Sequence, residues 1–469
     1  MTIKKLDLGG MDLLGADLDK FERLFPDLVT EERDETGRLK KSIDFEKFKA
    51  RFSADIISEG KERYEFTWPG KRAAMAEANA PTNKTLRPVV EESKNWDTTE
   101  NLYIEGDNLE VLKLLQESYL GQVKMIYIDP PYNTGKDFVY DDDFKENLDE
   151  YNEDNADYDD EGGKLVKNTE SNGRFHSDWC SMIYPRLRLA KNLLSKDGVI
   201  FISMDDNEHE NLKKICDEVY DRNNLIVEMI VNKSSQIASE NIVSMHEYVL
   251  AYAKEIESFT LGENYKFTIS RGTVGNENQT TPIIEFPKGL PCYNIADGIY
   301  EETRKIEGSK ENIINYDPII VKDGKLYNNV RLKARWRSSN DMRNFFANNC
   351  KPTKAKINGE IFEIYFENDR FNPQIKKRVK EKINSLYLKN KRGSKYLEDL
   401  EINYFDNPKD PELIKYIAKR TTNKDSLILD FFSGFRVIIV IEANSYVNIR
   451  SSRLLPKFKT QKINSWCAA

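Results

Sequence analysis

The stretch "KMIYIDPPYNTGKDF", residues 124–138, decides the fold class of this chain. Its apolar run at 125–128 predicts a buried parallel strand. Pro130 and Pro131 must end that strand, because proline has no backbone N–H for the ladder. Open α/β sheets bind ligands beyond the carboxyl ends of their strands, so residues 129–132 form a stiff segment where chemistry is expected. A capped strand end without chemistry is the alternative.

The flanking segments alternate between helical and strand patterns. Helices are predicted over 108–120, 178–194 and 207–220, and strands over 123–129, 198–204, 225–233 and 246–254. Near the end, Asp410 and Pro411 suit the start of another helix, and "SLILDFFSG" predicts a strand entering a turn. This βαβ rhythm predicts an α/β fold with a Rossmann-like, doubly wound, mostly parallel sheet.

Composition bounds the function. The chain has 469 residues, enough for two or three domains, and a net charge of −8, which does not indicate a polyanion partner for the chain as a whole. Five cysteines form no C-x-x-C pair, and three scattered histidines give no metal-ligand spacing, so no metal is expected. No run approaches the ~20 apolar residues of a membrane span. We therefore expect a soluble, cytoplasmic protein.

Four regions follow from the pattern. Residues 1–95 are predicted to form an N-terminal accessory region, 96–255 one half of the α/β domain, 256–400 an inserted domain and 401–469 the other half of the α/β domain. The insertion carries two basic, aromatic-bearing patches, at 331–346 and 376–396, which suit phosphate contact. We predict DNA contact from Arg331, Lys333, Arg335, Trp336, Arg337, Lys376, Lys377 and Arg378, together with Phe345 and Phe346. A solvated helix face is the alternative for either patch.

The segments "IEGDNLEVLKLL", "VKMIYIDPPYNTGKDFVYDDDF", "RFHSDWCSMIYPRLRLAKNLLSKDGVIFISMDDNEHENLK" and "LILDFFSG" resemble the modification (Mod) subunit of type III restriction-modification systems. The resemblance implies a DNA adenine-N6 methyltransferase of the beta class, with a permuted class I methyltransferase fold. It makes the insertion the target-recognition region. It also implies S-adenosyl-L-methionine as cofactor, double-stranded DNA and a restriction (Res) helicase-nuclease subunit as partners, and a homodimer for the full-length protein.

The resemblance gives the opening segment a mechanism. The exocyclic amine of adenine is a poor nucleophile, because its lone pair is delocalised into the ring. The Asp129 carboxylate and the Pro130 carbonyl would grip both amine hydrogens, Pro131 would keep the segment rigid, and Tyr132 would stack on a base flipped out of the duplex.

Cofactor binding is predicted for two chain segments. By the resemblance, "LILDFFSG" is the cofactor strand and turn, whose glycine lets the backbone approach the ligand. "NPK" and "GDN" plausibly flank the same pocket, although a turn and a helix cap explain them equally well. The predicted cofactor residues are Asp107, Asn108, Asp129, Asn407, Lys409, Asp430, Phe432, Ser433 and Gly434.

After Gly434 the sequence departs from the family. Arg436 stands where the second motif glycine is expected, and residues 437–441 favour a strand rather than the family's helix start. The basic tail is typical of a sequence read out of its original frame, which predicts a truncated or frame-shifted product that binds S-adenosylmethionine weakly or not at all. An unpaired sheet edge should remain where further strands are missing.

Three functions therefore stay open. They are an active adenine-N6 methyltransferase, a catalytically inactive remnant that binds only DNA or its partner, and a cytosine-N4 methyltransferase, since the same acceptor geometry serves that amine.

Overall fold

The computed structural model divides the chain into two compact units, which we describe separately. Unit 1 comprises 1–260 and 384–469, and unit 2 comprises Leu261–Ile383, inside the predicted insertion at 256–400. The structure describes residues 13–33, 37, 39–52, 65–93, 96–98, 101–135, 138–140, 156–158, 164–167, 173–238, 243–274, 280–301, 304–305, 312–368, 370–388, 409–432, 437–442 and 457–462.

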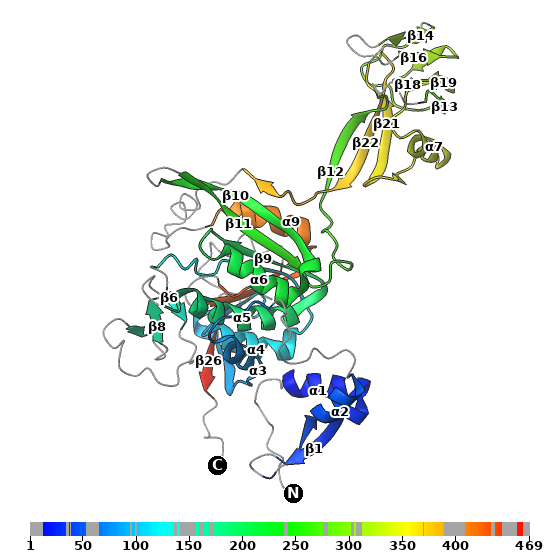
Figure 1. Ribbon diagram of the computed structural model, residues 1–469. Coiled ribbons are helices and arrows are strands. Elements are labelled where there is room, and N and C mark those ends of the chain that lie inside the picture. The colour runs from blue at the N-terminus through cyan, green and yellow to red at the C-terminus, as the bar shows by residue number, and fades with distance from the viewer. Residues whose placement is uncertain are drawn as a thin grey trace. The chain divides into compact units, whose positions relative to one another are not determined.

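A ten-stranded sheet forms the centre of unit 1, in the order β23-β10-β11-β9-β5-β24-β25-β4-β26-β3 (Figure 1). Its strands are β3 (Lys84–Val89), β4 (Leu102–Glu105), β5 (Val123–Ile128), β9 (Leu194–Met204), β10 (Leu225–Ala238), β11 (Val243–Ala253), β23 (Leu386–Tyr387), β24 (Leu427–Asp430), β25 (Val437–Glu442) and β26 (Lys457–Lys462). The predicted strands β5, β9, β10, β11 and β24 are confirmed.

The sheet is mixed, which corrects the predicted mostly parallel arrangement. At its centre β5 runs parallel to both β9 and β24, as the apolar run of β5 requires. Antiparallel pairing joins β9 to β11, β11 to β10, β24 to β25 and β25 to β4. The α/β class stands, while parallel pairing is confined to β5 with β9 and β24, β10 with β23, and β26 with β4.

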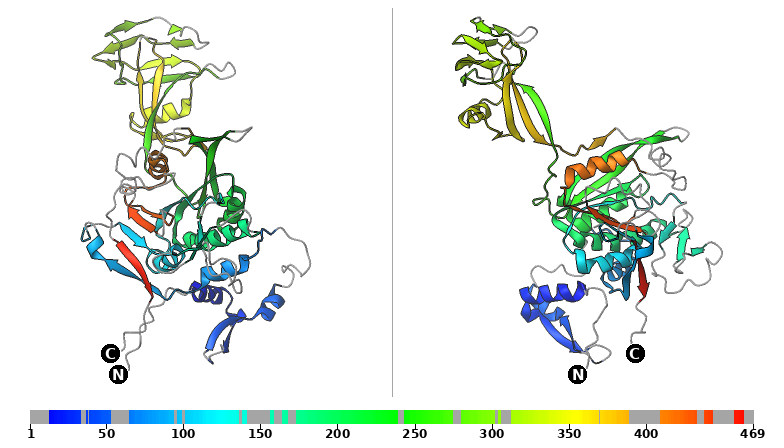
Figure 2. Two further views of the ribbon diagram at one scale, coloured as in Figure 1. Left: turned by 90° about the vertical axis from the view of Figure 1, so that its left-hand side faces the viewer. Right: turned by 180° about the vertical axis from the view of Figure 1, so that it is seen from behind.

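Helices cover both faces of this sheet (Figure 1 and Figure 2). One face carries α3 (Lys71–Asn79), α4 (Asn108–Tyr119), α5 (Phe175–Leu193) and α6 (His209–Cys216), and the other carries α9 (Pro411–Thr421). Successive side chains of β5 point to opposite faces of the sheet. Ile126 and Ile128 join the core beneath α5, whereas Met125 accepts a hydrogen bond from Thr421 at the end of α9. A fully buried strand with two apolar faces is the result.

α4 and α9 begin where the sequence predicts, whereas α5 begins at Phe175 and α6 at His209, within three residues of the predicted starts. Asp107 caps α4 by accepting a hydrogen bond from the Glu110 N–H, at 3.0 Å. Asp410 caps α9 in the same way, and Pro411 occupies the first helical position. α5 packs its long apolar face against α3 and α4, and its Trp179 is fully buried.

The described part of 1–95 contains helices and strands of its own. These are α1 (Leu13–Leu24), η1 (Pro26–Leu28), β1 (Val29–Arg33), β2 (Leu39–Ile43) and α2 (Phe45–Arg51), before α3, β3 and η2 (Val90–Glu92). The remaining elements of unit 1 are β6 (Phe138–Tyr140), β7 (Ala156–Tyr158), β8 (Lys164–Lys167), η4 (Asp217–Asp221) and η5 (Arg222–Asn224).

The described residues of unit 2 form three small antiparallel sheets and one helix, α7 (Ser339–Ala347). Its strands are β12 (Tyr265–Arg271), β13 (Ile283–Phe286), β14 (Gly298–Tyr300), β15 (Arg304–Lys305), β16 (Asn312–Asn315), β17 (Ile319–Lys322), β18 (Lys325–Leu326), β19 (Val330–Lys333), β20 (Thr353–Lys354), β21 (Glu360–Phe366) and β22 (Pro373–Lys380). A separate aromatic core, which includes Phe286, Trp336 and Phe366, holds them together.

Residues 437–442 form β25, as their β-branched side chains predict. β25 pairs with β24 on one side and with β4 on the other, and β26 pairs with β4 and β3. The predicted unpaired edge beside β24 is therefore wrong, because β25 occupies that place. In the described ranges, no helix has the length and apolar character needed to cross a membrane.

Candidate active site

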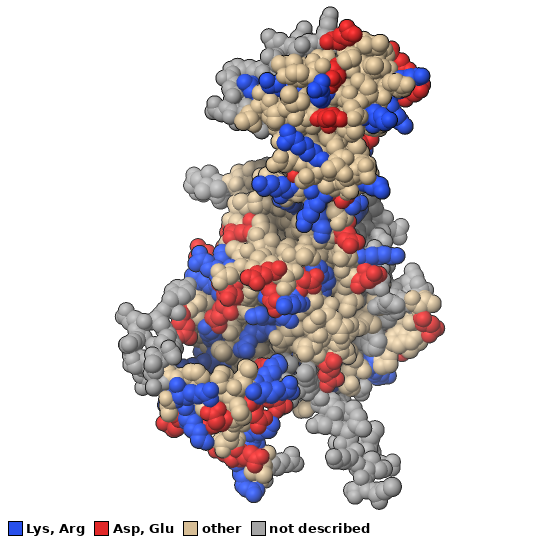
Figure 3. Space-filling view, turned by 90° about the vertical axis from the view of Figure 1, so that its right-hand side faces the viewer, with Lys and Arg blue, Asp and Glu red and all other residues tan. Residues whose placement is uncertain are grey.

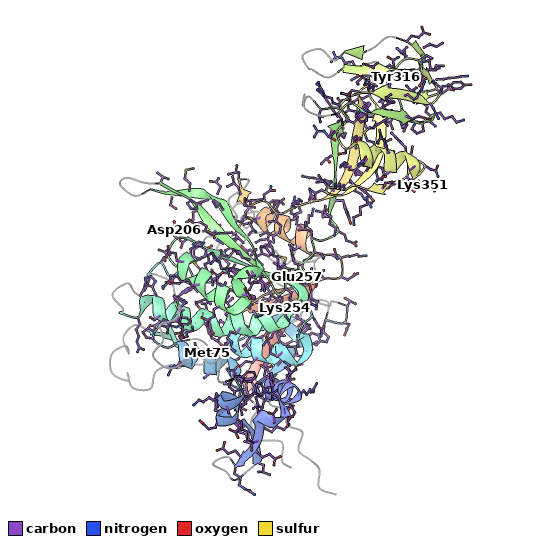
Figure 4. All side chains as sticks on the ribbon, turned by 45° about the vertical axis from the view of Figure 1, so that its right-hand side comes forward. Met75, Asp206, Lys254, Glu257, Tyr316 and Lys351 are labelled. Carbon is purple, nitrogen blue, oxygen red and sulfur yellow. The ribbon has the colours of Figure 1, made fainter. Side chains whose placement is uncertain are left out.

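The candidate site lies at one edge of the unit 1 sheet, where several strands end. β4, β24, β5 and β9 all run in the same direction, since β25 is antiparallel to both β24 and β4. Their carboxyl ends therefore share this edge, which we call the carboxyl edge. Figure 4 labels Asp206, just beyond the end of β9 at the carboxyl edge, and Lys254, which follows β11 at the opposite edge.

The motif segment, residues 129–132, follows β5 at this edge, and neighbouring side chains hold it in place. Pro130 is buried, and the Pro131 carbonyl accepts a hydrogen bond from the indole of Trp179 in α5, at 2.8 Å. Asn133 adopts a left-handed conformation with φ of 59°, which asparagine tolerates better than most residues. The segment is thus fixed by two prolines, one buried indole and a constrained turn.

Glu208, which is 1% exposed, anchors that turn. Its carboxylate accepts hydrogen bonds from the side chains of Asn133 at 2.6 Å and Asn211 at 2.8 Å. His176 Nδ1 lies 2.6 Å from the same carboxylate. A buried carboxylate with several donors is a stable brace, because its charge is satisfied by hydrogen bonds.

Four side chains meet in front of the motif. The Lys409 ammonium donates to Glu247 Oε2 at 2.8 Å, contacts the Tyr132 hydroxyl and lies 3.4 Å from Asp129 Oδ1. The Tyr132 hydroxyl donates to Glu247 Oε2 at 3.2 Å. Lys409 and Glu247 are 10% and 8% exposed, so the cation sits between two carboxylates with little water around it. The structure therefore brings together three of the predicted site residues, Asp129, Tyr132 and Lys409.

Burial and the nearby charges determine the protonation states of Lys409 and Tyr132. Burial alone would lower the pKa of Lys409, but the Asp129 and Glu247 carboxylates outweigh it, and the pKa lies above its usual value. Burial, followed by the Asp129 and Glu247 charges, raises the pKa of Tyr132 well above its usual value. At neutral pH the lysine is an ammonium and the tyrosine a neutral phenol.

Two predicted cofactor residues lie at the turn between β4 and α4. The Asn108 amide donates to the Phe431 carbonyl at 2.9 Å, which ties this turn to the end of β24. The buried Arg186 guanidinium donates to Asn108 Oδ1 at 2.6 Å and lies 3.7 Å from Asp107 Oδ2. Asn108 is 1% exposed, so it joins the two strand ends.

The other predicted cofactor residues have mixed placements. Asp430 is fully buried, and its Oδ1 accepts the Phe432 N–H at 3.0 Å, so it shapes the turn after β24. Phe432 is 8% exposed and packs in the core of unit 1. Asn407, Ser433 and Gly434 lie outside the described residues.

Comparison with known proteins agrees with this arrangement. The family model described as "DNA methylase", for N6 and N4 methyltransferases, matches residues 123–445, which include β5, the motif segment and β24. The chain belongs to the DNA methylase family.

Curated relatives of this methylase include restriction-modification proteins. The type III EcoPI Mod subunit of Escherichia phage P1 is 33% identical over 430 residues, covering 85% of this chain and 63% of the relative. The type III EcoP15I Mod subunit of Escherichia coli is 30% identical over 420 residues, covering 81% and 62%. The type II methyltransferase M.KpnI of Klebsiella pneumoniae is 34% identical over 161 residues, covering 34% and 33%. The methylase thus spans less than two thirds of the length of these Mod subunits.

Two aromatic residues that are predicted to contact DNA lie in the core of unit 2. Trp336 is 1% exposed and its indole donates to the Pro282 carbonyl at 2.8 Å, and Phe345 is also 1% exposed. Both side chains belong to the core of unit 2, so their prediction as surface contacts is corrected. The aromatic residues of this patch thus reflect packing of the core.

The basic residues around Trp336 differ in exposure. Arg331 and Arg337 are exposed, whereas Lys333 and Arg335 are partly buried, as is Phe346. Arg331 forms a bidentate pair with Asp317, and its hydrogen bonds lower the pKa of Asp317 to about 2. Acidic and basic side chains are interspersed over the face of the molecule in Figure 3.

The first residues of the second basic patch, 376–380, lie in β22, and their side chains therefore alternate between two faces, while residues 389–396 of the patch lie outside the described residues. Lys376 and Arg378 face Phe267 and Tyr265 of β12, with ammonium or guanidinium groups 5.0 and 4.9 Å from the ring centroids. Lys377 points to the other face, where it lies 3.8 Å from Asp341 and is 17% exposed. The predicted trio is thus divided, and a helix face is excluded for 376–378.

Sequence reasoning missed Glu247, Glu208 and Trp179 as members of the site. Glu247 is an acidic residue directly before the mostly apolar second half of β11, a signal that a charge is buried with a partner. Glu208 and Trp179 stand in segments that resemble the family, but their hydrogen bonds to the motif turn are visible only in the fold.

Proposed function

We propose that this methylase transfers a methyl group from S-adenosylmethionine to adenine N6 in double-stranded DNA, as the modification and recognition subunit of a type III restriction-modification system. The rigid segment from Asp129 to Tyr132 at the carboxyl edge supports this most strongly. It offers a carboxylate, a carbonyl and an aromatic ring that Trp179 and Glu208 hold in place.

The chemistry follows from these groups. Asp129 and the Pro130 carbonyl accept the two amine hydrogens of a flipped base and aim the nitrogen lone pair away from the ring plane. Tyr132 stacks on the base, whose amine is inaccessible in the duplex. Because prolines and buried hydrogen bonds fix these acceptors in advance, little reorganisation is needed when the amine attacks.

The strand ends at the carboxyl edge fit the predicted cofactor. S-adenosylmethionine supplies an electrophilic methyl group on a sulfonium centre, and its hydroxyl and ammonium groups suit carboxylate acceptors. Asp107 is partly exposed beside the end of β24, to which Asn108 ties it. We assign Asp107 a contact with the ligand, while Asn108 and Asp430 hold the two turns, and Asn407, Ser433 and Gly434 remain predicted contacts.

The finer fold assignment, a permuted class I methyltransferase, belongs to the same proposal. The catalytic strand β5 precedes the predicted cofactor strand β24 in the chain, yet the two are parallel neighbours. This order places the amine-gripping residues before the cofactor turn.

The partners follow from the likeness to Mod subunits. We propose double-stranded DNA as substrate, unit 2 as the target-recognition domain, a restriction subunit as partner and a homodimer as the working assembly. Lys376 and Arg378, with Arg331 and Arg337, are the proposed contacts to the DNA backbone, and Lys333 and Arg335 are secondary candidates.

The same observations are compatible with two other functions. Cytosine N4 is an exocyclic amine that the same acceptors would grip. A chain that only binds DNA or its partner is the other alternative, since residue 436 is an arginine.

One experiment separates the three functions. Mixed-sequence duplex DNA is incubated with the purified chain and S-adenosylmethionine, digested, and its nucleosides are measured by mass spectrometry. We expect N6-methyl-2′-deoxyadenosine. N4-methyl-2′-deoxycytidine would establish the second function, and unmodified DNA in the presence of measurable DNA binding would establish the third.

A further inference from the structure

Three acceptors of the protein surround the Lys409 ammonium. An ammonium has three N–H donors. Lys409 Nζ donates to Glu247 Oε2 at 2.8 Å and to the Tyr132 hydroxyl, and it lies 3.4 Å from Asp129 Oδ1. Asp129 and Tyr132 belong to the motif segment, so these contacts hold the lysine on the side of the site where the base is expected.

The same ammonium lies at the hydroxyl end of the Tyr132 ring. Its nitrogen contacts the hydroxyl and lies 4.6 Å from the ring centroid, so it meets the edge of the ring and not one of its faces. A second contact holds the same end, because the Tyr132 hydroxyl donates to Glu247 at 3.2 Å. The hydroxyl end of the ring is therefore fixed by two buried side chains.

The carboxylates of Asp129 and Glu247 keep the Lys409 ammonium in contact with Tyr132. Two carboxylates, from Asp129 and Glu247, face one buried cation. Loss of the lysine would leave two like charges close together with little water, and loss of Glu247 would free both the hydroxyl and the ammonium. Each member therefore depends on the others.

We propose that Lys409 and Glu247 are positioning residues that fix the Tyr132 ring by its hydroxyl, in the orientation in which the target base stacks on it. The proposal rests on the proposed methyl-transfer function and reassigns Lys409, which the sequence placed with the cofactor. A ring held in advance loses less freedom when the base stacks on it, and the amine meets Asp129 in one orientation.

The test compares Lys409→Met with Lys409→Arg and Glu247→Gln, and Lys415→Met, an exposed lysine of α9, is the matched control. The protein carries 3-fluorotyrosine, and the Tyr132 resonance is assigned by its absence from Tyr132→Phe. Three further quantities are measured: the Kd for S-adenosylmethionine, the fluorescence of 2-aminopurine at the target position and the single-turnover methyl-transfer rate.

Lys409→Met should shift the Tyr132 fluorine resonance and lower both 2-aminopurine fluorescence and the methyl-transfer rate, the latter by at least about tenfold. The Kd for S-adenosylmethionine should stay within about twofold, since the Lys409 ammonium is directed at Glu247, Tyr132 and Asp129. Lys409→Arg should restore part of the rate, Glu247→Gln should have a smaller effect, and Lys415→Met should match the wild type.

An unchanged fluorine resonance in both Lys409→Met and Glu247→Gln would overturn the positioning role, and this holds whether or not the chain is active. A large loss of S-adenosylmethionine affinity with unchanged 2-aminopurine fluorescence would overturn it as well, in favour of a cofactor contact. If the wild-type chain transfers no methyl group, the proposed function and the stacking role both fail, while the resonance still decides whether Lys409 holds the ring.

Discussion

The carboxyl edge of unit 1 and the surface of β22 in unit 2 both carry charged side chains, but they hold them differently. At the carboxyl edge, Lys409 is 10% exposed and its charge is neutralised by two carboxylates. On β22, Arg378 pairs with Glu360 and is 43% exposed. A buried ion pair is costly to desolvate, whereas an exposed pair exchanges easily with other partners.

This difference matches two kinds of task. A pre-formed buried network suits chemistry, which needs fixed geometry. Exposed pairs on a strand suit reversible contact with a charged polymer, because the acidic partner can be exchanged for phosphate. The predictions below test whether the two regions are specialised in this way.

The largest effect is expected at Asp129. Asp129→Ala removes an acceptor that grips the amine in the transition state, so the methyl-transfer rate should fall by at least about 1,000-fold, or roughly 4 kcal/mol in the barrier. Single-turnover kinetics with labelled cofactor measures it. Asp425→Ala, an exposed aspartate before β24, is the control and should be neutral. A rate close to wild type for Asp129→Ala would remove the carboxylate from the mechanism.

Trp336 tests the role of aromatic residues in unit 2. Because its indole is buried and hydrogen-bonded, Trp336→Ala should destabilise unit 2 by about 3–5 kcal/mol, measured by chemical unfolding. Tyr327→Ala, at a side chain that is 62% exposed, should cost much less. If Trp336→Ala left stability intact and weakened only DNA binding, the indole would be a surface contact after all.

Glu208 should show a smaller effect on stability. Glu208→Ala leaves the donors of Asn133 and Asn211 without their acceptor, which should cost about 1–3 kcal/mol and also slow methyl transfer through the loosened motif turn. Glu210→Ala, two residues along and exposed, is the control. Thermal unfolding of both variants, with the methyl-transfer rate at a permissive temperature, decides whether the brace exists.

The smallest effect concerns the β22 surface. Replacing Lys376 and Arg378 by methionine should weaken DNA binding and lower the slope of log K against log salt by about 2, since each phosphate contact contributes about 0.9. Lys377→Met should leave the slope unchanged, because that side chain points to the other face toward Asp341. Equal effects of the three substitutions would argue against alternation of the two faces.

The sequence predicted the elements that follow local rules. Asp410 and Pro411 start α9, and the apolar run before Pro130 is β5, because caps, prolines and periodicity act within a few residues. The approach of Lys409 to Asp129 could not be predicted in the same way. Those residues are far apart in the chain, and only the parallel pairing of β5 with β24 brings their segments together.

Amino-acid composition predicted the functional residues less well than the sequence motif did. The basic composition of 376–396 predicts DNA contact without a strand period, and so it does not separate Lys377 from Lys376 and Arg378 on the opposite face of β22. Trp336 and Phe345 were read as DNA contacts because they stand beside arginines, but a small domain buries its large aromatic side chains first. The mixed sheet was missed because strand direction depends on long-range pairing.

The central claim is that the carboxyl edge performs the chemistry while the β22 surface only holds DNA. Single-turnover methyl transfer at saturating DNA tests it most directly, with Asp129→Ala compared with the Lys376→Met, Arg378→Met double variant. The account predicts loss of transfer in Asp129→Ala and a wild-type rate constant in the double variant once DNA is saturating. A rate constant that falls in the double variant as far as in Asp129→Ala would contradict it.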